Sequence, residues 1–150
     1  MEIELPQDFK EFLQFINANR VEYLLVGGYA VGYHGYPRAT ADIDIWVAAT
    51  PENQARLGKA LIDFGFSPAT VAKEFSLREP EGIHIGVPPL RIDLLTSISG
   101  ATFADCYPRG IAGILDGVEL RVIHLADLRA NKRAAGRSKD LNDLENLPDG

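Results

Sequence analysis

The spacing of apolar residues predicts the first elements of the chain. Phe9, Phe12, Leu13 and Ile16 recur at helical intervals. This pattern predicts an amphipathic helix over 6–19 whose apolar side packs on a sheet. A continuous apolar run at 23–26 predicts a buried strand, and a second strand opens at Asp42. The chain is therefore expected to begin with a helix and two strands.

The next segment carries the signals of a helix start and a helix stop. Thr50 is an expected N-cap, followed by a proline at the first helical position and an acidic first turn. Gly65 is expected to end this helix. The pattern of residues 67–80 does not indicate one type of secondary structure. A short helix near 70–75 is one possibility that it allows.

Two strands are expected in the second half, at 82–87 and 90–96, with Pro88-Pro89 fixing the turn between them. In the second of these strands, Ile92 and Leu94 share one face. Asp93 therefore points to the other face.

The last third of the chain predicts a hairpin followed by two helices. The expected hairpin strands are 111–115 and 119–124. They flank Asp116-Gly117, a pair favoured in tight hairpin turns. Residues 125–147 predict two helices that break near Gly136, the second capped by Ser138 and made amphipathic by its leucines.

Asp42 and Asp44 share one face of the second strand, because residues i and i+2 of a strand point the same way, roughly 7 Å apart. Two ionised carboxylates at this spacing repel and raise each other's pKa unless a cation neutralises them. The usual cation is a divalent metal with oxygen ligands. The pair therefore predicts a site for Mg²⁺ or Mn²⁺.

Gly27 and Gly28 stand between the first strand and a short helical segment. Glycine lets the backbone approach a ligand closely, and the N–H groups at the positive end of a helix suit a phosphate. An expected phosphate site is thus joined to an expected metal site. Arg38 and Thr40 come just before the strand that carries Asp42 and Asp44. They are either phosphate contacts or ordinary loop residues.

The order of an apolar strand, Gly-Gly, a spacer and Asp-x-Asp resembles the signature of the nucleotidyltransferase superfamily with the polymerase-beta-like fold. The form GGYAVGYHGYPRATADIDIWV is similar to its small prokaryotic members, which include toxin-type nucleotidyltransferases. The family usually has Gly-Ser where this chain has Gly27-Gly28, and Gly-Gly is also found among relatives. The resemblance implies an α/β (α+β) fold, with a mixed β-sheet flanked by helices. It also implies a third carboxylate on a later strand, and Asp93 is the matching position.

Lys132 follows two leucines at helical spacing, which places it on the inward side of its helix. A buried ammonium needs an anionic partner. We expect that partner, within about 6 Å, to be Asp42, Asp44, Asp93 or a bound phosphate. The small relatives carry a similar segment, a lysine followed by Gly-Arg-x-Lys-Asp. The resemblance implies that Lys132 holds nucleotide phosphates or supports the metal carboxylates.

Composition limits the class of protein. A chain of 150 residues, 46% of them hydrophobic, fits one domain over 1–150. The net charge of −6 argues against a surface coated for nucleic acid, although a local basic patch is compatible with it. The single cysteine, Cys106, excludes an internal disulfide, and no signal peptide or long apolar run is visible, so a cytoplasmic protein with no membrane partner is expected. His34 and His84 are isolated and are expected to be structural or exposed.

The leading hypothesis is an enzyme that transfers a nucleotidyl group from a nucleoside triphosphate such as ATP to an acceptor hydroxyl on RNA, for example tRNA, on protein or on a small molecule. Asp42 and Asp44 would bridge two metal ions, and Asp93 would complete the site of the ion that activates the acceptor. Gly27 and Gly28 would seat the triphosphate, while Arg38 and Lys132 would offset charge on the leaving pyrophosphate.

Two alternatives stay open. One is a non-catalytic nucleotide-binding module with the same fold that acts through a partner protein or as a homodimer, as an antitoxin might. The other is a metal-dependent phosphohydrolase that uses water as acceptor. The three carboxylates argue against the non-catalytic module, because paired negative charges repel and nothing favours keeping them in a site without activity.

Overall fold

A computed structural model describes residues 3–75, 82–86 and 90–149 of the chain. Its centre is one six-stranded sheet with the strand order β3-β4-β2-β1-β6-β5. The strands are β1 (Tyr23–Val26), β2 (Asp42–Val47), β3 (Ile83–Ile85), β4 (Arg91–Leu95), β5 (Ile111–Leu115) and β6 (Val118–Val122). The sheet is mixed, because β2 pairs parallel with β4 and β1 parallel with β6, while the other neighbours are antiparallel.

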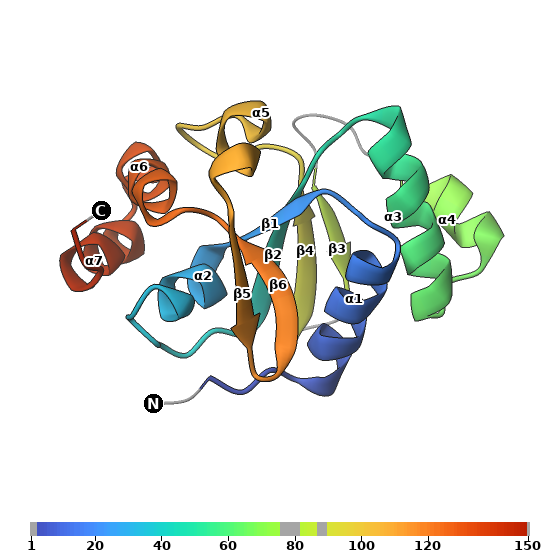
Figure 1. The fold of residues 1–150 in the computed structure, drawn as a ribbon, viewed down its shortest axis with the longest axis horizontal. Helices are drawn as coiled ribbons and strands as arrows, with labels where there is room; N and C mark the ends of the chain where they lie inside the picture. The colour runs from blue at the N-terminus through green and yellow to red at the C-terminus, as the bar shows by residue number, and fades with distance from the viewer. Residues whose placement is uncertain (1–2, 76–81, 87–89, 150) are drawn as a thin grey trace.

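Helices lie on both sides of the sheet (Figure 1). They are α1 (Gln7–Ala18), α2 (Gly27–Tyr33), α3 (Pro51–Phe64), α4 (Pro68–Glu74), α5 (Phe103–Cys106), the 3₁₀ turn η1 (Tyr107–Arg109), α6 (Leu125–Ala135) and α7 (Ser138–Asn146). In Figure 1, α1, α3 and α4 stand on one side, and α2, α6 and α7 on the other. The described chain is thus a mixed α/β protein, the fold class that the resemblance implied.

The register of the two central parallel strands separates an apolar face from a polar one. Ile43 and Ile45 of β2 are fully buried. Because side chains alternate across a strand, Asp42, Asp44 and Trp46 lie on the opposite face. Asp44 stands in register with Asp93 of β4. The expected carboxylates therefore occupy neighbouring strands on one face of the sheet.

Most predicted elements are confirmed. The first helix, the buried strand at 23–26 and the hairpin around Asp116-Gly117 lie where the pattern placed them. Thr50 caps α3 by accepting the backbone N–H of Asn53 at 3.2 Å. The ambiguous segment forms α4, and the turn expected at Pro88-Pro89 lies outside the described residues.

One predicted cap is wrong. Residue 137, not Ser138, is the N-cap of α7, and Arg137 donates its backbone N–H to Asp140 at 3.1 Å. Gly136, at φ 64°, ends α6 in the left-handed conformation that glycine adopts readily. This sharp reversal folds α7 back against α6.

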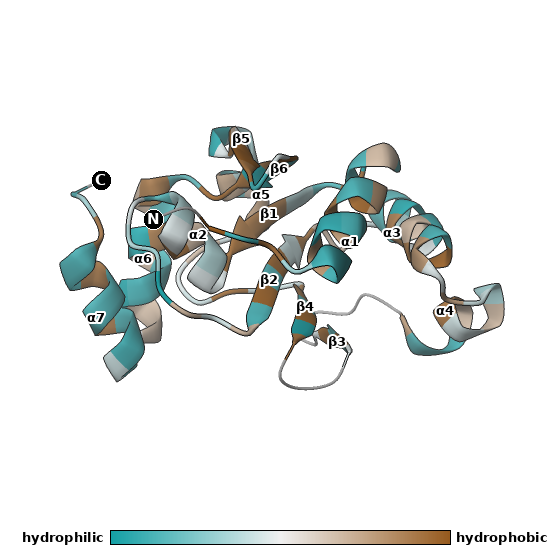
Figure 2. Cartoon of the chain, turned by 90° about the horizontal axis from the view of Figure 1, so that it is seen from below, coloured by the Kyte–Doolittle hydropathy of each residue, from teal (hydrophilic) through white to brown (hydrophobic). Residues whose placement is uncertain are grey.

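Hydropathy differs between the sheet and the last helix. Figure 2 shows the central strands largely brown, whereas α7 is mostly teal. Within the described ranges, no helix is both long enough and apolar enough to cross a membrane.

Candidate functional site

A cavity of about 460 Å³ lies where β1 passes into α2, at the start of β2 and beside α6. Seven of the eight predicted site residues line it: Gly27, Gly28, Arg38, Thr40, Asp42, Asp44 and Lys132. The eighth, Asp93, faces Asp44 across the β2–β4 pairing. Folding therefore brings together the glycine turn, the carboxylates and basic residues from the C-terminal helices.

The carboxylates on the strands have weak internal counterions. Arg91 places its Nη2 3.4 Å from Asp42 and its Nε 3.6 Å from Asp93. These distances exceed those of strong charge-assisted hydrogen bonds. The buried Nε of Arg91 has no hydrogen-bond partner among the described residues. Arg91 thus neutralises the cluster only in part.

Asp44 is the carboxylate most affected by this lack of positive charge. Burial, followed by the neighbouring Asp93 and Asp42, raises the pKa of Asp44 from 3.8 to about 7. Lys139 opposes this shift through its charge. An anionic Asp44 is therefore unfavourable near neutral pH unless a cation joins it.

His84 contacts the cluster from the sheet edge, a contact that the sequence did not reveal. It pairs directly opposite Asp93 in the β3–β4 ladder, and its Nδ1 lies 2.5 Å from Asp93 Oδ1. Its side chain is 59% exposed, as expected, but the contact with Asp93 means that it is not isolated. The signal was present in the two adjacent strands, but alternation alone does not give the register between them.

The glycine turn lies directly against the carboxylates. Gly27 has φ 68°, and a Cβ at this position would overlap the carboxylate of Asp44. A Cβ at Gly28 would lie 3.0 Å from the side chain of Thr40 and 3.3 Å from Arg38 Nη1. Gly27 therefore requires glycine, whereas a side chain at Gly28 would be tight against Thr40 and Arg38. Because α2 has only seven residues, its dipole is a weak anion site by itself.

Lys132 is buried, as predicted, but its ion-pair partners are two aspartates that the sequence did not single out. Its ammonium lies 3.2 Å from Asp140 and 3.1 Å from Asp143, both on α7. Among the described residues, none of the strand carboxylates lies within ion-pair distance of it. The aspartates on the strands are not the only acidic residues that face the core. The reversal at Gly136 turns two aspartates of α7 inward as well.

Arg38 also takes its partner from α7. Its Nε and Nη2 donate to the two carboxylate oxygens of Asp143 at 2.8 and 2.9 Å. Thr40 donates its hydroxyl to the backbone oxygen of Asp42 at 3.1 Å. Both residues line the cavity, and both also fix the loop that leads into β2. The bidentate pair ties this loop to the C-terminal helix.

The sequence did not predict the buried acidic side of α7. The leucine pattern predicted that the leucines, and not the aspartates, face the core. Leu141 is 51% exposed, while Asp140 and Asp143 are buried. Burial alone would raise the pKa of Asp140, but hydrogen bonds from Arg137 and Lys132 hold it below its ordinary value. Hydrogen bonds from Arg38 and Lys132 lower the pKa of Asp143 in the same way.

Two further cations stand at the cavity and were not assigned from the sequence. Arg137 and Lys139 both line it. Arg137 contacts Asp140 at 2.7 Å with its side chain 62% exposed. In the described part of the chain, Lys139 has no carboxylate within ion-pair distance. Both belong to the Gly-Arg-x-Lys-Asp segment, and this motif was the feature of the sequence that could have identified them as site residues.

The donor set suits a hard divalent cation, although it is not pre-arranged. Among the described residues, no three His, Cys, Asp or Glu side chains are placed to hold a metal ion. Asp42, Asp44 and Asp93 nevertheless offer carboxylate oxygens from neighbouring strands, which are ligands that Mg²⁺ and Mn²⁺ prefer. Burial and the neighbouring carboxylates raise the pKa of Asp44, and Arg91 reaches only Asp42 and Asp93. Metal binding would require the weak contacts of Arg91 to be exchanged for the cation.

A scan against protein-family models and a search of curated proteins each gave no match for this chain.

Proposed function

We propose that this chain transfers a nucleotidyl group from a nucleoside triphosphate to an acceptor hydroxyl, with Mg²⁺ or Mn²⁺ as cofactor. One observation carries the proposal: a single cavity joins the glycine turn to Asp42 and Asp44 and is bordered by basic side chains. A polyphosphate needs close backbone approach, cations and metal ligands, and all three meet there.

The carboxylates would hold the metal. Asp42 and Asp44 on β2 and Asp93 on β4 would supply the oxygens. The long contacts of Arg91 with Asp42 and Asp93 would give way to the metal ion. When bound, the metal would favour deprotonation of the acceptor hydroxyl and offset the charge of the leaving pyrophosphate. Because Asp44 must be ionised to bind a cation, metal affinity rises with pH through about 7.

The basic residues divide into two roles. Lys132 and Arg38 are engaged by Asp140 and Asp143, so they position α7 and the loop before β2. Arg137 and Lys139, which are exposed at the cavity, are the better phosphate contacts. This assignment moves the charge-offsetting role from Lys132 and Arg38 to their neighbours on α7.

The proposal is tested by incubating the purified protein and Mg²⁺ or Mn²⁺ with each α-labelled nucleoside triphosphate, with and without total RNA or cell extract. Transfer predicts label joined to a macromolecule or a small hydroxyl compound, with release of pyrophosphate. Release of label only as free nucleotide identifies a hydrolase, and binding without turnover identifies a nucleotide-binding module.

Matched variants locate the reaction. Asp44→Asn and Asp42→Asn should each abolish turnover, because each removes a metal ligand from the cavity. Asp63→Asn is the control, since Asp63 lies on α3 in contact with Lys59 and Asn19. Full activity in folded Asp44→Asn protein would refute the site assignment.

A further inference from the structure

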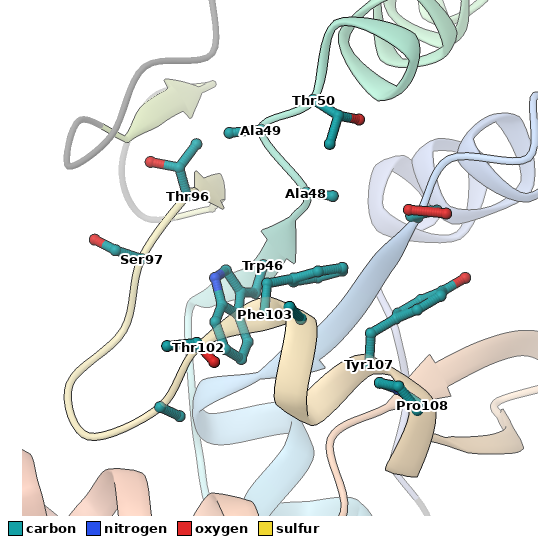
Figure 3. A pocket seen from close by; sticks show the side chains of 13 residues that line it. Trp46, Ala48, Ala49, Thr50, Thr96, Ser97, Thr102, Phe103, Tyr107 and Pro108 are labelled. Carbon is teal, nitrogen blue, oxygen red and sulfur yellow. The ribbon is translucent and has the colours of Figure 1, made fainter.

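A second and larger cavity adjoins the first. It has a volume of about 830 Å³, lies at the carboxyl ends of β2 and β4, and is lined in part by α5 and η1. Ser97 lines both cavities, so the two are neighbours on the same side of the sheet. Figure 3 shows its walls, with Ala48, Ala49 and Thr50 on one side and Trp46 and Phe103 on another. A volume of this size suits a small organic ligand.

One wall is a row of aromatic rings held in place by mutual contacts. Phe103 stacks on Tyr107 with ring centroids 5.1 Å apart, and Trp46 meets Phe103 edge-on at 5.2 Å. The guanidinium of Arg121 covers Tyr107 at 4.5 Å from the ring centroid. These contacts fix the rings before any ligand arrives. A rigid aromatic wall favours a planar, apolar ring system.

Trp46 places an unused, buried hydrogen-bond donor beside this cavity. Its side chain is 1% exposed, and its Nε1 has no hydrogen-bond partner among the described residues. Figure 3 shows the ring nitrogen directed to the side of the cavity where Ser97 lies. A buried N–H without a partner is unfavourable, so a ligand that accepts this bond gains specificity.

The charge of the lining differs from that of the first cavity. None of the described lining residues is lysine or arginine, and Glu22 is the one acidic residue among them. The described lining therefore offers a polyphosphate no cation of its own. The hydroxyl of Ser97 offers a polar contact to an uncharged ligand, while those of Thr50 and Thr102 already bond to Asn53 and Asp105.

We propose that the second cavity binds a nucleoside, an uncharged planar heterocycle with its sugar, whose ring nitrogen or carbonyl accepts the Trp46 N–H. The choice of a nucleoside rests on the proposed function, because the adjoining basic cavity then holds the phosphates attached to it. The nucleoside belongs either to the donor triphosphate or to a nucleotide acceptor. Both sources present the same chemistry to the aromatic wall.

Trp46 is the single tryptophan of the chain, so its fluorescence reports this cavity alone. Titration of the whole protein with adenosine, guanosine, cytidine and uridine, without metal, should give a saturable change with at least one nucleoside. Ala104→Phe fills the cavity from an exposed position and should weaken that binding tenfold or more. Ala112→Phe, the same change at an exposed position on β5, should leave it unchanged.

Removal of the donor tests the hydrogen bond. Trp46→Phe, measured by calorimetry, should weaken binding about fivefold to tenfold while keeping an aromatic side chain. Competition between the nucleoside and its triphosphate assigns the cavity to the donor, and simultaneous binding of the two assigns it to the acceptor. No saturable change at millimolar concentration with any of the four nucleosides, or wild-type affinity in Ala104→Phe, overturns the proposal.

This test is separate from the transfer reaction. Asp44→Asn should lose turnover yet bind nucleosides as the wild type does, because Asp44 does not line the second cavity. Turnover without nucleoside binding would refute the cavity assignment alone. Nucleoside binding without turnover would refute the proposed function alone.

Discussion

Two groups of aspartates in this protein meet very different amounts of positive charge. Asp140 and Asp143 on α7 are buried, and Lys132, Arg38 and Arg137 supply cations within 3.3 Å. The strand group of Asp42, Asp44 and Asp93 has Arg91 at 3.4 Å or more and the exposed His84. Folding lowers the pKa values of the first group and raises that of Asp44.

The contrast separates a charge cluster that is compensated within the chain from one that is not. The α7 aspartates are satisfied within the chain, so they hold α6, α7 and the loop before β2 together. The strand aspartates are crowded without equal compensation, which is typical of sites that await a ligand. Their dependence on pH has opposite signs, and the predictions below use this difference.

The largest effect is expected from Lys132→Met. It leaves Asp140 and Asp143 buried beside one cation fewer, so the free energy of unfolding should fall by about 3–5 kcal/mol. The melting temperature should drop by roughly 10 °C, measured by thermal unfolding at pH 8. Lys73→Met, at an exposed position on α4, is the control and should change little. A melting temperature like that of the wild type would show that the α7 cluster does not hold the tail.

Asp44→Asn should have the opposite sign. Ionised Asp44 destabilises the folded state because its pKa rises from 3.8 to about 7 on folding. The penalty is absent below pH 3.8, grows as the pH rises toward 7 and is complete above it. The variant should therefore exceed the wild type by about 2–4 kcal/mol at pH 8 and match it near pH 4.

Denaturant unfolding across this pH range measures the gap. Asp42→Asn provides the comparison, because Arg91 already contacts Asp42 and the side chain of Asp42 is 38% exposed, so a smaller gain is expected. An Asp44→Asn protein that is less stable than the wild type at pH 8 would contradict the assignment of Asp44 as an uncompensated carboxylate. The α7 pair should act the other way, losing its contribution only in strong acid.

Metal addition should compensate the strand group without affecting the α7 group. Mn²⁺ at about one hundred times its Kd should stabilise the wild type by about 2.7 kcal/mol at pH 8. The gain should shrink at pH 5, where Asp44 is protonated, and vanish in Asp44→Asn. Differential scanning calorimetry with and without Mn²⁺ measures it. Equal stabilisation of Asp44→Asn would place the metal elsewhere.

The smallest effect is expected from His84→Gln. The contact of His84 with Asp93 is short, but the side chain is 59% exposed, so solvent screens the pair and its removal should cost less than about 1 kcal/mol. Chemical unfolding at pH 6 and pH 8 should show this small change. A loss comparable to that of Lys132→Met would mean that the edge strand β3 depends on this contact.

Much of the local structure could be predicted from the chain because it depends on neighbours in sequence. Helical spacing located α1, Thr50 located the start of α3, and the Asp116-Gly117 pair located the β5–β6 turn. Strand alternation also put Asp42 and Asp44 on one face. These features follow from periods and caps that a few residues define.

The sequence by itself thus determined the main elements, the inward position of Lys132 and the placement of Asp42 and Asp44 on one face of their strand. Tertiary structure alone decided that Lys132 meets Asp140 and Asp143, that His84 meets Asp93, and that a second cavity with the Trp46 N–H adjoins the first. The physical reason is that an ion pair or a cavity wall depends on strand register and helix reversal. Periodicity places a side chain on a face, but only the packed fold selects what that face meets.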